Sequence, residues 1–264
     1  MPVAQRQEQT TAGRQGLLVA ERLTRAFGGP PVVDGVSFTL ARGSITGLIG
    51  PNGAGKTTLF NLIAGSLAPG GGTLTLDGAR IDGLRPDQVF ARGLARTFQI
   101  PRPFPAMTVL ENVMLAPPGQ AGERFWTNWL RPAAVAAEER RNRDRAMLWL
   151  DFVGLAKLSA QPAGVLSGGQ RKLLELARVL VAEPRLILLD EPGAGVSPPL
   201  LALIMEKIAE LNARGTTFLV IEHNMDLVMT LCRPVLVLAQ GRLLLEGSPE
   251  EVRRDPRVVE AYLG

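Results

Sequence analysis

The segment GPNGAGKTT, residues 50–58, has the residue types and the spacing of a loop that binds the phosphates of a nucleotide. It fits the pattern G-x-x-x-x-G-K-[ST] in full. Its glycines let backbone N–H groups curl around phosphate oxygens, and the helix that follows adds positive potential there. We expect Lys56 to reach the β- and γ-phosphates of ATP, and the Thr57 hydroxyl to hold Mg²⁺. The expected nucleotide-binding residues are Gly50, Pro51, Asn52, Gly53, Ala54, Gly55, Lys56, Thr57 and Thr58.

An acidic pair, Asp190 and Glu191, closes the apolar run RLILLDEP at residues 185–192. Ligands of open α/β sheets bind beyond the carboxyl ends of the strands, where the nucleotide is expected here. An aspartate at that place can hold the metal directly or through water. The next carboxylate points in another direction and can orient or deprotonate the attacking water. An acidic helix cap is the alternative, and the phosphate loop upstream disfavours it.

Two further polar residues follow predicted strands. His223 is the only histidine and ends the run TTFLVIEH, so a contact with the γ-phosphate is favoured over a purely structural role. Gln99, in RTFQIP, begins an irregular segment and can touch Mg²⁺ or the attacking water. On composition alone, a glutamine in a surface loop explains Gln99 equally well.

A second glycine-containing stretch, VLSGGQRKLLELARVL, occupies residues 165–180. Ser167 has the character of an N-cap, and Gly168 and Gly169 leave backbone N–H groups accessible at the helix start. An ordinary capped helix is one interpretation. The other is a second anion cradle, which is useful only if it covers the side of a triphosphate that the first loop leaves open. Since a helical insertion after Gln99 separates the two cradles within one chain, we expect two chains to pair head to tail, with two ATP per dimer.

The elements that must position these residues alternate between strands and helices. Short β-like runs fill residues 17–40, a buried strand at 44–50 enters the glycine loop, and 72–78 is a further edge strand. Residues 100–120 are rich in proline and irregular, and roughly 123–155 is helical. Strands then alternate with helices to the end of the chain. This order predicts a mostly parallel sheet covered on both faces.

Composition sets broader limits on the class of protein. The chain has 264 residues, of which 46% are hydrophobic and 20% charged, enough for a large globular domain. A net charge of +4 is compatible with polyanionic ligands, anionic lipid or nucleic acid and selects none of them. The single cysteine, Cys232, excludes an internal disulfide framework and suits a reducing cytosol. Residues 1–15 are expected to be a disordered polar tail, and no apolar run is long enough to span a membrane.

The motifs together resemble one family. GPNGAGKTT, the glutamine in TFQ, LSGGQ, LILLDEP and the histidine in IEH occur in the order of the ATP-binding cassette (ABC) ATPases, and the resemblance covers about residues 17–264. It implies an α/β P-loop NTPase (RecA-like) fold, with a mostly parallel sheet, an N-terminal antiparallel β subdomain and an inserted α-helical subdomain. We accordingly expect one ABC ATP-binding domain over residues 16–264, with the helical subdomain at about 100–180.

The resemblance also implies roles for individual residues. Phe27 stands where an aromatic ring stacks on adenine in the family, although tyrosine is commoner there. Glu191 is implied to be the hydrolytic base, with His223 and Gln99 as the other catalytic residues. The implied metal-binding residues are Thr57, Gln99 and Asp190. The residues implied to contact the partner chain's γ-phosphate are Ser167, Gly168, Gly169 and Gln170.

A narrower resemblance rests on RTFQIPRPFPAMTVLENVMLA, on the insert with Phe125, Trp126 and Trp129, and on the ending EEVRRDPRVVEAYLG. These segments are similar to ATP-binding subunits of bacterial importers for branched-chain or other hydrophobic amino acids. The implied partners are a second ABC ATPase, identical or related, two transmembrane permease subunits and, indirectly, a solute-binding protein. The chain would then lie peripherally on the cytoplasmic face of the inner membrane, with a groove after Gln99 that receives a permease coupling helix.

Some alternatives remain open at this level. ATPases of urea-type importers are closely related, and lipopolysaccharide-extraction or other exporters have similar motifs. A soluble ABC protein acting on nucleic acid is disfavoured by the single cassette, the single cysteine and the absence of sustained heptads, so no nucleic-acid partner is expected. One departure from the family stands at residues 194–197, Ala-Gly-Val-Ser, where many members have an acidic residue. This departure puts in doubt how the two ATP sites of a dimer would influence each other.

Overall fold

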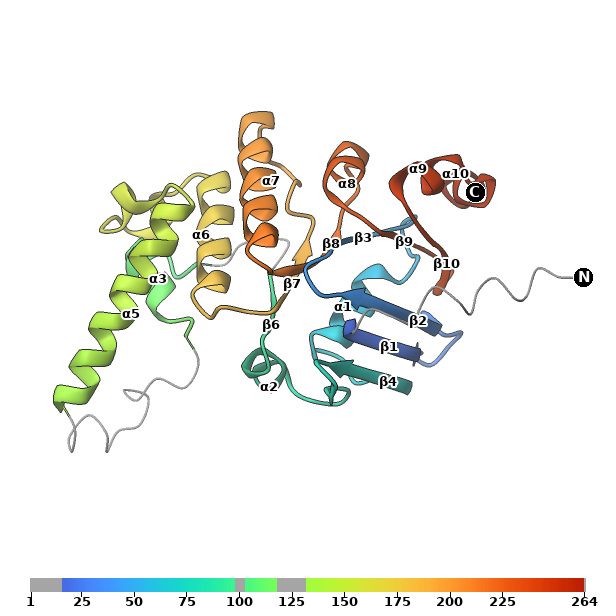
Figure 1. Ribbon diagram of the computed structural model, residues 1–264, viewed down its shortest axis with the longest axis horizontal. Coiled ribbons are helices and arrows are strands. Elements are labelled where there is room, and N and C mark those ends of the chain that lie inside the picture. Colours follow the sequence, from blue (N-terminus) through green and yellow to red (C-terminus); the bar gives the residue numbers. More distant parts are fainter. Residues whose placement is uncertain (1–15, 98–102, 118–131, 264) are drawn as a thin grey trace, which may run out of the picture.

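A computed structural model describes residues 16–97, 103–117 and 132–263 of the chain (Figure 1). Gln99, the aromatic residues Phe125, Trp126 and Trp129, and the tail at 1–15 lie outside the described residues. The described residues form two sheets, with helices packed between and beside them (Figure 1).

The smaller sheet is antiparallel where its pairing is defined and has the strand order β2-β1-β4-β5. Its strands are β1 (Gly16–Arg25), β2 (Val33–Ala41), β4 (Gly71–Leu76) and β5 (Ala79–Arg80). Buried and more exposed residues alternate along much of β2, which is typical of a strand with one covered face.

The larger sheet has six strands in the order β10-β9-β3-β8-β7-β6. All neighbours are parallel except the pair β9 and β10. The strands are β3 (Ile45–Ile49), β6 (Leu94–Arg96), β7 (Leu186–Asp190), β8 (Thr217–Ile221), β9 (Val235–Ala239) and β10 (Arg242–Gly247). Every residue of β3, β7 and β8 is buried, which explains why their sequences are mostly apolar and do not alternate.

The side chains of β7 show how both faces of the larger sheet are covered. Leu186 and Leu188 join the core shared with α1 (Lys56–Ile63) and the smaller sheet, whereas Ile187 and Leu189 join a second core. The helices that supply this second core include α6 (Gly168–Leu180), α7 (Pro198–Ala213), α8 (Met225–Leu231) and α9 (Pro249–Arg254). The sheet is therefore covered on both faces, as its sequence pattern predicts.

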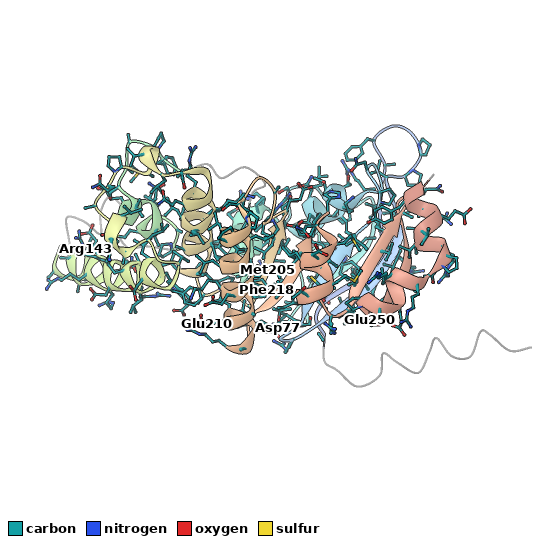
Figure 2. All side chains as sticks on the ribbon, turned by 90° about the horizontal axis from the view of Figure 1, so that it is seen from above. Asp77, Arg143, Met205, Glu210, Phe218 and Glu250 are labelled. Carbon is teal, nitrogen blue, oxygen red and sulfur yellow. The ribbon has the colours of Figure 1, made fainter. Side chains whose placement is uncertain are left out.

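The remaining helices lie at the edges of this arrangement. α2 (Pro86–Ala91) precedes β6, and α10 (Pro256–Leu263) closes the described chain. Between β6 and β7, α3 (Val109–Met114) and α5 (Pro132–Phe152) pack beside α6 at one end of the molecule (Figure 1). Two short 3₁₀ turns, Ala156–Leu158 and Ala163–Val165, connect α5 to α6. Seen from above, Arg143 of α5 and Glu250 of α9 lie far apart, with Phe218 of β8 between them (Figure 2).

Candidate functional site

The glycine loop joins the end of β3 to the start of α1, as its sequence predicts. Gly55 is the N-cap of α1 and has a φ of 100°, in the left-handed region that favours glycine. A Cβ atom at Gly55 would lie 2.4 Å from the carbonyl oxygen of Val32, and one at Gly50 would lie 2.0 Å from that of Leu238. The loop thus needs glycine at both ends, because neighbouring backbone leaves no room for a side chain.

The ammonium group of Lys56 lies inside the curve of this loop. Its Nζ donates hydrogen bonds to the carbonyl oxygens of Gly50 at 2.7 Å and of Pro51 at 2.9 Å. Burial lowers the pKa of Lys56, and the negative charge of Glu191 acts in the opposite direction. A positive charge is therefore held beside the backbone N–H groups at the start of α1, which is an arrangement suited to anionic phosphate.

A cavity of about 350 Å³ opens over the loop. Glu191 and His223, which lie far from the glycine loop in the sequence, line the same cavity. The full set of lining residues is Val32, Asn52, Gly53, Ala54, Gly55, Lys56, Thr57, Thr58, Glu191, Ile221 and His223. The structure thus brings together three motifs that the sequence singles out separately.

Glu191 and His223 contact each other directly. The Nε2 atom of His223 lies 3.0 Å from Oε1 of Glu191, which is hydrogen-bond distance. Both residues follow neighbouring parallel strands, β7 and β8, and the N–H of Glu191 donates to the carbonyl of Ile221 at 3.0 Å. Glu191 has a φ of 50°, which is uncommon for a residue with a side chain. Strained backbone of this kind is found preferentially at functional sites.

Asp190 is held by Arg96, a residue that the sequence analysis does not single out. The Nη2 atom of Arg96 lies 2.8 Å from Oδ2 of Asp190, and both side chains are largely buried. The guanidinium also contacts the amide oxygen of Asn61 and lies over the ring of Phe60, with its Cζ atom 5.8 Å from the ring centroid. The pair forms because β6 and β7 are neighbours in the sheet, and nothing in the spacing of the two residues along the chain indicates it.

The start of α6 is a capped helix. The Ser167 hydroxyl accepts from the N–H of Gln170 at 3.2 Å, and the Gln170 side chain accepts from the N–H of Ser167 at 2.9 Å. Ser167 and Gly168 are exposed, while Gly169 and Gln170 are partly so. None of the four lines the cavity over the glycine loop. Within one chain, the two glycine stretches are therefore not parts of one pocket.

Phe27 lies between β1 and β2 and is 56% exposed. The Arg25 guanidinium lies 5.0 Å from its ring centroid, and Phe27 does not line the cavity. Gln99 is outside the described residues. Among the described residues, no group of three or more His, Cys, Asp or Glu side chains is arranged to hold a metal ion.

The sequence model of the family described as "ABC transporter" matches residues 33–194, which is more than half of the chain. The chain belongs to the ABC transporter family. A second model, described as "Branched-chain amino acid ATP-binding cassette transporter", matches residues 242–264 of this ABC ATPase.

Two curated relatives of this ABC ATPase match over nearly their whole length. It is 42% identical over 251 residues to the high-affinity branched-chain amino acid transport ATP-binding protein LivG of Salmonella typhimurium, covering 95% of this chain and 98% of that protein. It is 39% identical to BraF of Pseudomonas aeruginosa, a protein with the same description, covering 94% and 98%. A crystal structure of a nucleotide-free ATP-binding cassette from an ABC transporter superposes with a TM-score of 0.82 at 36% identity, covering 95% of this chain and 100% of that one.

These similarities confirm three predictions from the sequence. The protein has the α/β fold of a P-loop NTPase, it binds ATP, and it is an ATPase whose activity is coupled to transport. It is the nucleotide-binding subunit of an ABC transporter. Across the described residues, none of the helices combines the length and the apolar character that crossing a membrane requires.

Proposed function

We propose that this ABC ATPase drives the import of branched-chain or other hydrophobic amino acids. The observation that carries the proposal is the similarity to LivG along almost the whole chain, together with the branched-chain amino acid family model at the C-terminal end. The alternatives of a urea-type importer and of an exporter have no comparable support from these similarities.

The proposed partners are a second ABC ATPase, identical or related, and two transmembrane permease subunits, with a solute-binding protein acting through the permeases. The chain would then lie on the cytoplasmic face of the inner membrane. Exposed apolar side chains beside α3 support docking of a permease subunit on this part of the chain. Phe104 and Val165 are 52% and 69% exposed, and their segments are joined by a hydrogen bond from the Gly164 N–H to the Pro105 carbonyl at 3.0 Å. An exposed apolar surface of this kind suits a permease helix.

In the proposed ATP site, the backbone N–H groups of residues 52–58 and the Lys56 ammonium hold the phosphates. The Thr57 hydroxyl lines the cavity and is a hard oxygen ligand of the kind that Mg²⁺ prefers. Asp190 does not line the cavity and its Oδ2 is paired with Arg96, so its carboxylate would hold the ion through water. Gln99 is the third proposed ligand. When bound, Mg²⁺ would neutralise charge that develops on the phosphates. Phe27 is the proposed stacking partner of the adenine ring.

Glu191 is the proposed general base for ATP hydrolysis. Its carboxylate lines the cavity beside Lys56, where it can take the proton of the water that attacks the γ-phosphate. His223 holds Oε1 of this carboxylate through Nε2 and is the proposed contact for the γ-phosphate itself. The hydrogen bond between the two side chains would orient the base before the nucleotide binds.

The start of α6, Ser167 to Gln170, is proposed to bind the γ-phosphate held by the partner chain. This role accounts for a second glycine stretch that does not line the chain's own cavity. Ser167 and Gly168 are exposed at the helix start, where another chain can supply the anion.

The substrate class is tested with the complete transporter. The chain, its permeases and its solute-binding protein are reconstituted in proteoliposomes, and ATP hydrolysis is measured with and without leucine, isoleucine, valine or urea. We expect the three branched-chain amino acids to stimulate hydrolysis and urea to leave it at the basal rate. Stimulation by urea alone would contradict the proposed substrate class while leaving the ATPase assignment intact.

A further inference from the structure

Glu222 is a buried carboxylate next to the site, and the proposed reaction gives it no direct role. It follows β8 and is only 3% exposed. Its Oε1 accepts a hydrogen bond from the N–H of Gly193 at 2.6 Å. Its Oε2 accepts from the N–H groups of His223 at 3.0 Å and of Asn224 at 3.1 Å. Glu222 thus holds two separate backbone segments with one side chain.

These hydrogen bonds fix the two residues that contact each other in the cavity. Gly193 lies in the loop that begins at Glu191, and the other segment carries His223 itself. A buried carboxylate is costly unless N–H donors compensate its charge, and such charge-assisted hydrogen bonds are stronger than neutral ones. The Glu222 carboxylate therefore favours one relative position of the Glu191 loop and the His223 backbone.

The same loop is held from its other side by α6. The Nζ atom of Lys172 donates to the carbonyl oxygens of Glu191 at 3.3 Å, Pro192 at 3.2 Å and Ala194 at 2.5 Å. Burial lowers the pKa of Lys172, and the nearby carboxylates of Glu222, Glu175 and Glu191 oppose that shift. Lys172 lies two residues after Gln170 on α6, so the helix that would contact the partner's ATP also holds the loop of the proposed hydrolytic base.

We propose that Glu222 is a positioning residue for ATP hydrolysis, and that Lys172 connects it through the loop 191–194 to the partner-facing start of α6. The inference rests on the proposed roles of Glu191 and His223. It also supplies a route between the ATP site of this chain and the ATP site that α6 would contact on the partner. Closure of α6 on the partner's nucleotide would move Lys172 and, with it, the carbonyls of loop 191–194 that it binds. Because Glu222 accepts from the N–H groups of both Gly193 and His223, this movement would also shift His223.

The first test replaces Glu222 by glutamine in the full-length chain. A glutamine side chain has one acceptor oxygen, and its NH₂ group cannot accept from an N–H, so either Gly193 or His223 loses its partner. We expect kcat for Mg-ATP hydrolysis to fall by roughly ten- to a hundredfold, with KM within about threefold, as for a lost transition-state contact. The matched control is Glu206→Gln, at an exposed position of α7, for which both constants should stay at the wild-type values.

A double-mutant cycle tests whether Glu222 acts through His223. His223→Ala removes the imidazole while leaving the backbone N–H that Glu222 binds. We expect the loss of kcat caused by Glu222→Gln to be at least about threefold smaller in the His223→Ala background, because coupled residues are not additive. The same fold-loss in both backgrounds would overturn the positioning role.

Lys172→Met tests the connection to α6 and keeps the proposal testable if Glu222→Gln does not fold. It removes the donor to three carbonyls, and we expect kcat to fall about tenfold or more with little change in KM, the pattern of an interaction needed only in the transition state. Lys172→Arg, which keeps a charged donor, should restore part of the lost rate, and exposed Lys157→Met is the matched control. Wild-type kcat in Lys172→Met would overturn the connection.

Glu191→Gln separates failure of this inference from failure of the proposed site. If Glu191→Gln hydrolyses ATP at the wild-type rate, the proposed site is wrong. If Glu191→Gln loses activity while Glu222→Gln matches Glu206→Gln, only the positioning role is overturned. A Glu222→Gln variant that loses ATP affinity in proportion to kcat would also overturn it, because a general structural defect affects both.

Discussion

Among single residues, Lys56 places an ammonium group inside the glycine loop, where the phosphates are expected. Its Nζ is held by the carbonyls of Gly50 and Pro51, which are neutral acceptors. Phosphate oxygens carry full negative charge and make stronger hydrogen bonds with an ammonium group. We therefore expect the Lys56 ammonium to leave the carbonyls of Gly50 and Pro51 and to bind the β- and γ-phosphates when ATP enters the cavity.

Lys56→Ala is expected to abolish nucleotide binding, because it removes this charge from the glycine loop. Binding of a fluorescent ATP analogue in the presence of Mg²⁺ is the measurement. Exposed Lys157→Met serves as the control and should bind as the wild type does. If Lys56→Ala bound the ATP analogue with unchanged affinity, the assignment of the glycine loop as the nucleotide-binding loop would be wrong.

The reactivity of the Cys232 thiol should depend on pH and on folding. Burial is the main cause that raises the pKa of its thiol from 9.0 to about 12, and the charge of Glu222 adds to the shift. The thiolate is the reactive form, so the folded protein should react with iodoacetamide at pH 8 far more slowly than the protein unfolded in guanidinium. Between pH 9 and 12 the unfolded chain binds fewer protons at this thiol, so its contribution to the free energy of unfolding falls with rising pH. Equal alkylation rates for folded and unfolded protein would contradict the burial of Cys232.

At the scale of elements, Arg96 joins three of them. It lies on β6, pairs with Asp190 at the end of β7, and contacts Asn61 and Phe60 of α1. Both members of the ion pair are largely buried, so removing one leaves a carboxylate without its cation.

Arg96→Met is expected to lower the free energy of unfolding by about 2–4 kcal/mol, because breaking a largely buried ion pair leaves an uncompensated charge. Urea denaturation followed by circular dichroism is the measurement. Exposed Arg92→Met, on the turn after α2, is the matched control and should change stability by less than about 0.5 kcal/mol. A loss in Arg96→Met no larger than that of the control would show that the pair does not stabilise the β6–β7 edge.

At the scale of the whole molecule, the position of α6 bears on how many chains the reaction needs. Its start does not line the cavity over the glycine loop, and Ser167 and Gly168 face outward. If this start covers another chain's γ-phosphate, ATP must hold two chains together until it is hydrolysed. The partner is either a second copy or a related ATPase.

Glu191→Gln is expected to trap that pair. Glutamine keeps the size of the side chain but cannot take the proton from water, so turnover should fall by about a hundredfold or more while ATP still binds. The paired form should then accumulate in Mg-ATP, alone or with the second ATPase. Size-exclusion chromatography with light scattering, with and without Mg-ATP, gives the mass of the complex.

Ser167→Arg in the same background is the control for the interface. A bulky cation at Ser167 would occupy the space meant for the partner's γ-phosphate, so the ATP-dependent pair should be lost. If the pair persists in the double variant, or never forms in Glu191→Gln with either partner, α6 begins as a capped helix with no role in nucleotide binding.

The sequence alone determined the features that depend on neighbours along the chain. The glycine loop between β3 and α1 follows from GPNGAGKTT, since its backbone conformation requires glycine at fixed spacing. The cap between Ser167 and Gln170 follows from residues three apart, which is a local geometry. The buried strand that ends at Asp190 follows from a continuous apolar run. These motifs sufficed to predict the fold class and the ATPase activity.

Only the tertiary structure decided which of these motifs meet. β7 and β8 are neighbouring strands. Glu191 directly follows β7, and His223 comes two residues after β8 ends at Ile221, so the two side chains meet at the same edge of the sheet. The pairs Arg96–Asp190 and Glu222–Gly193 join residues distant in the chain, and spacing in sequence carries no signal for contacts made by strand order. A buried glutamate beside a histidine is indistinguishable in sequence from a solvated one. Its three N–H partners are defined only when the sheet brings both loops to the same edge.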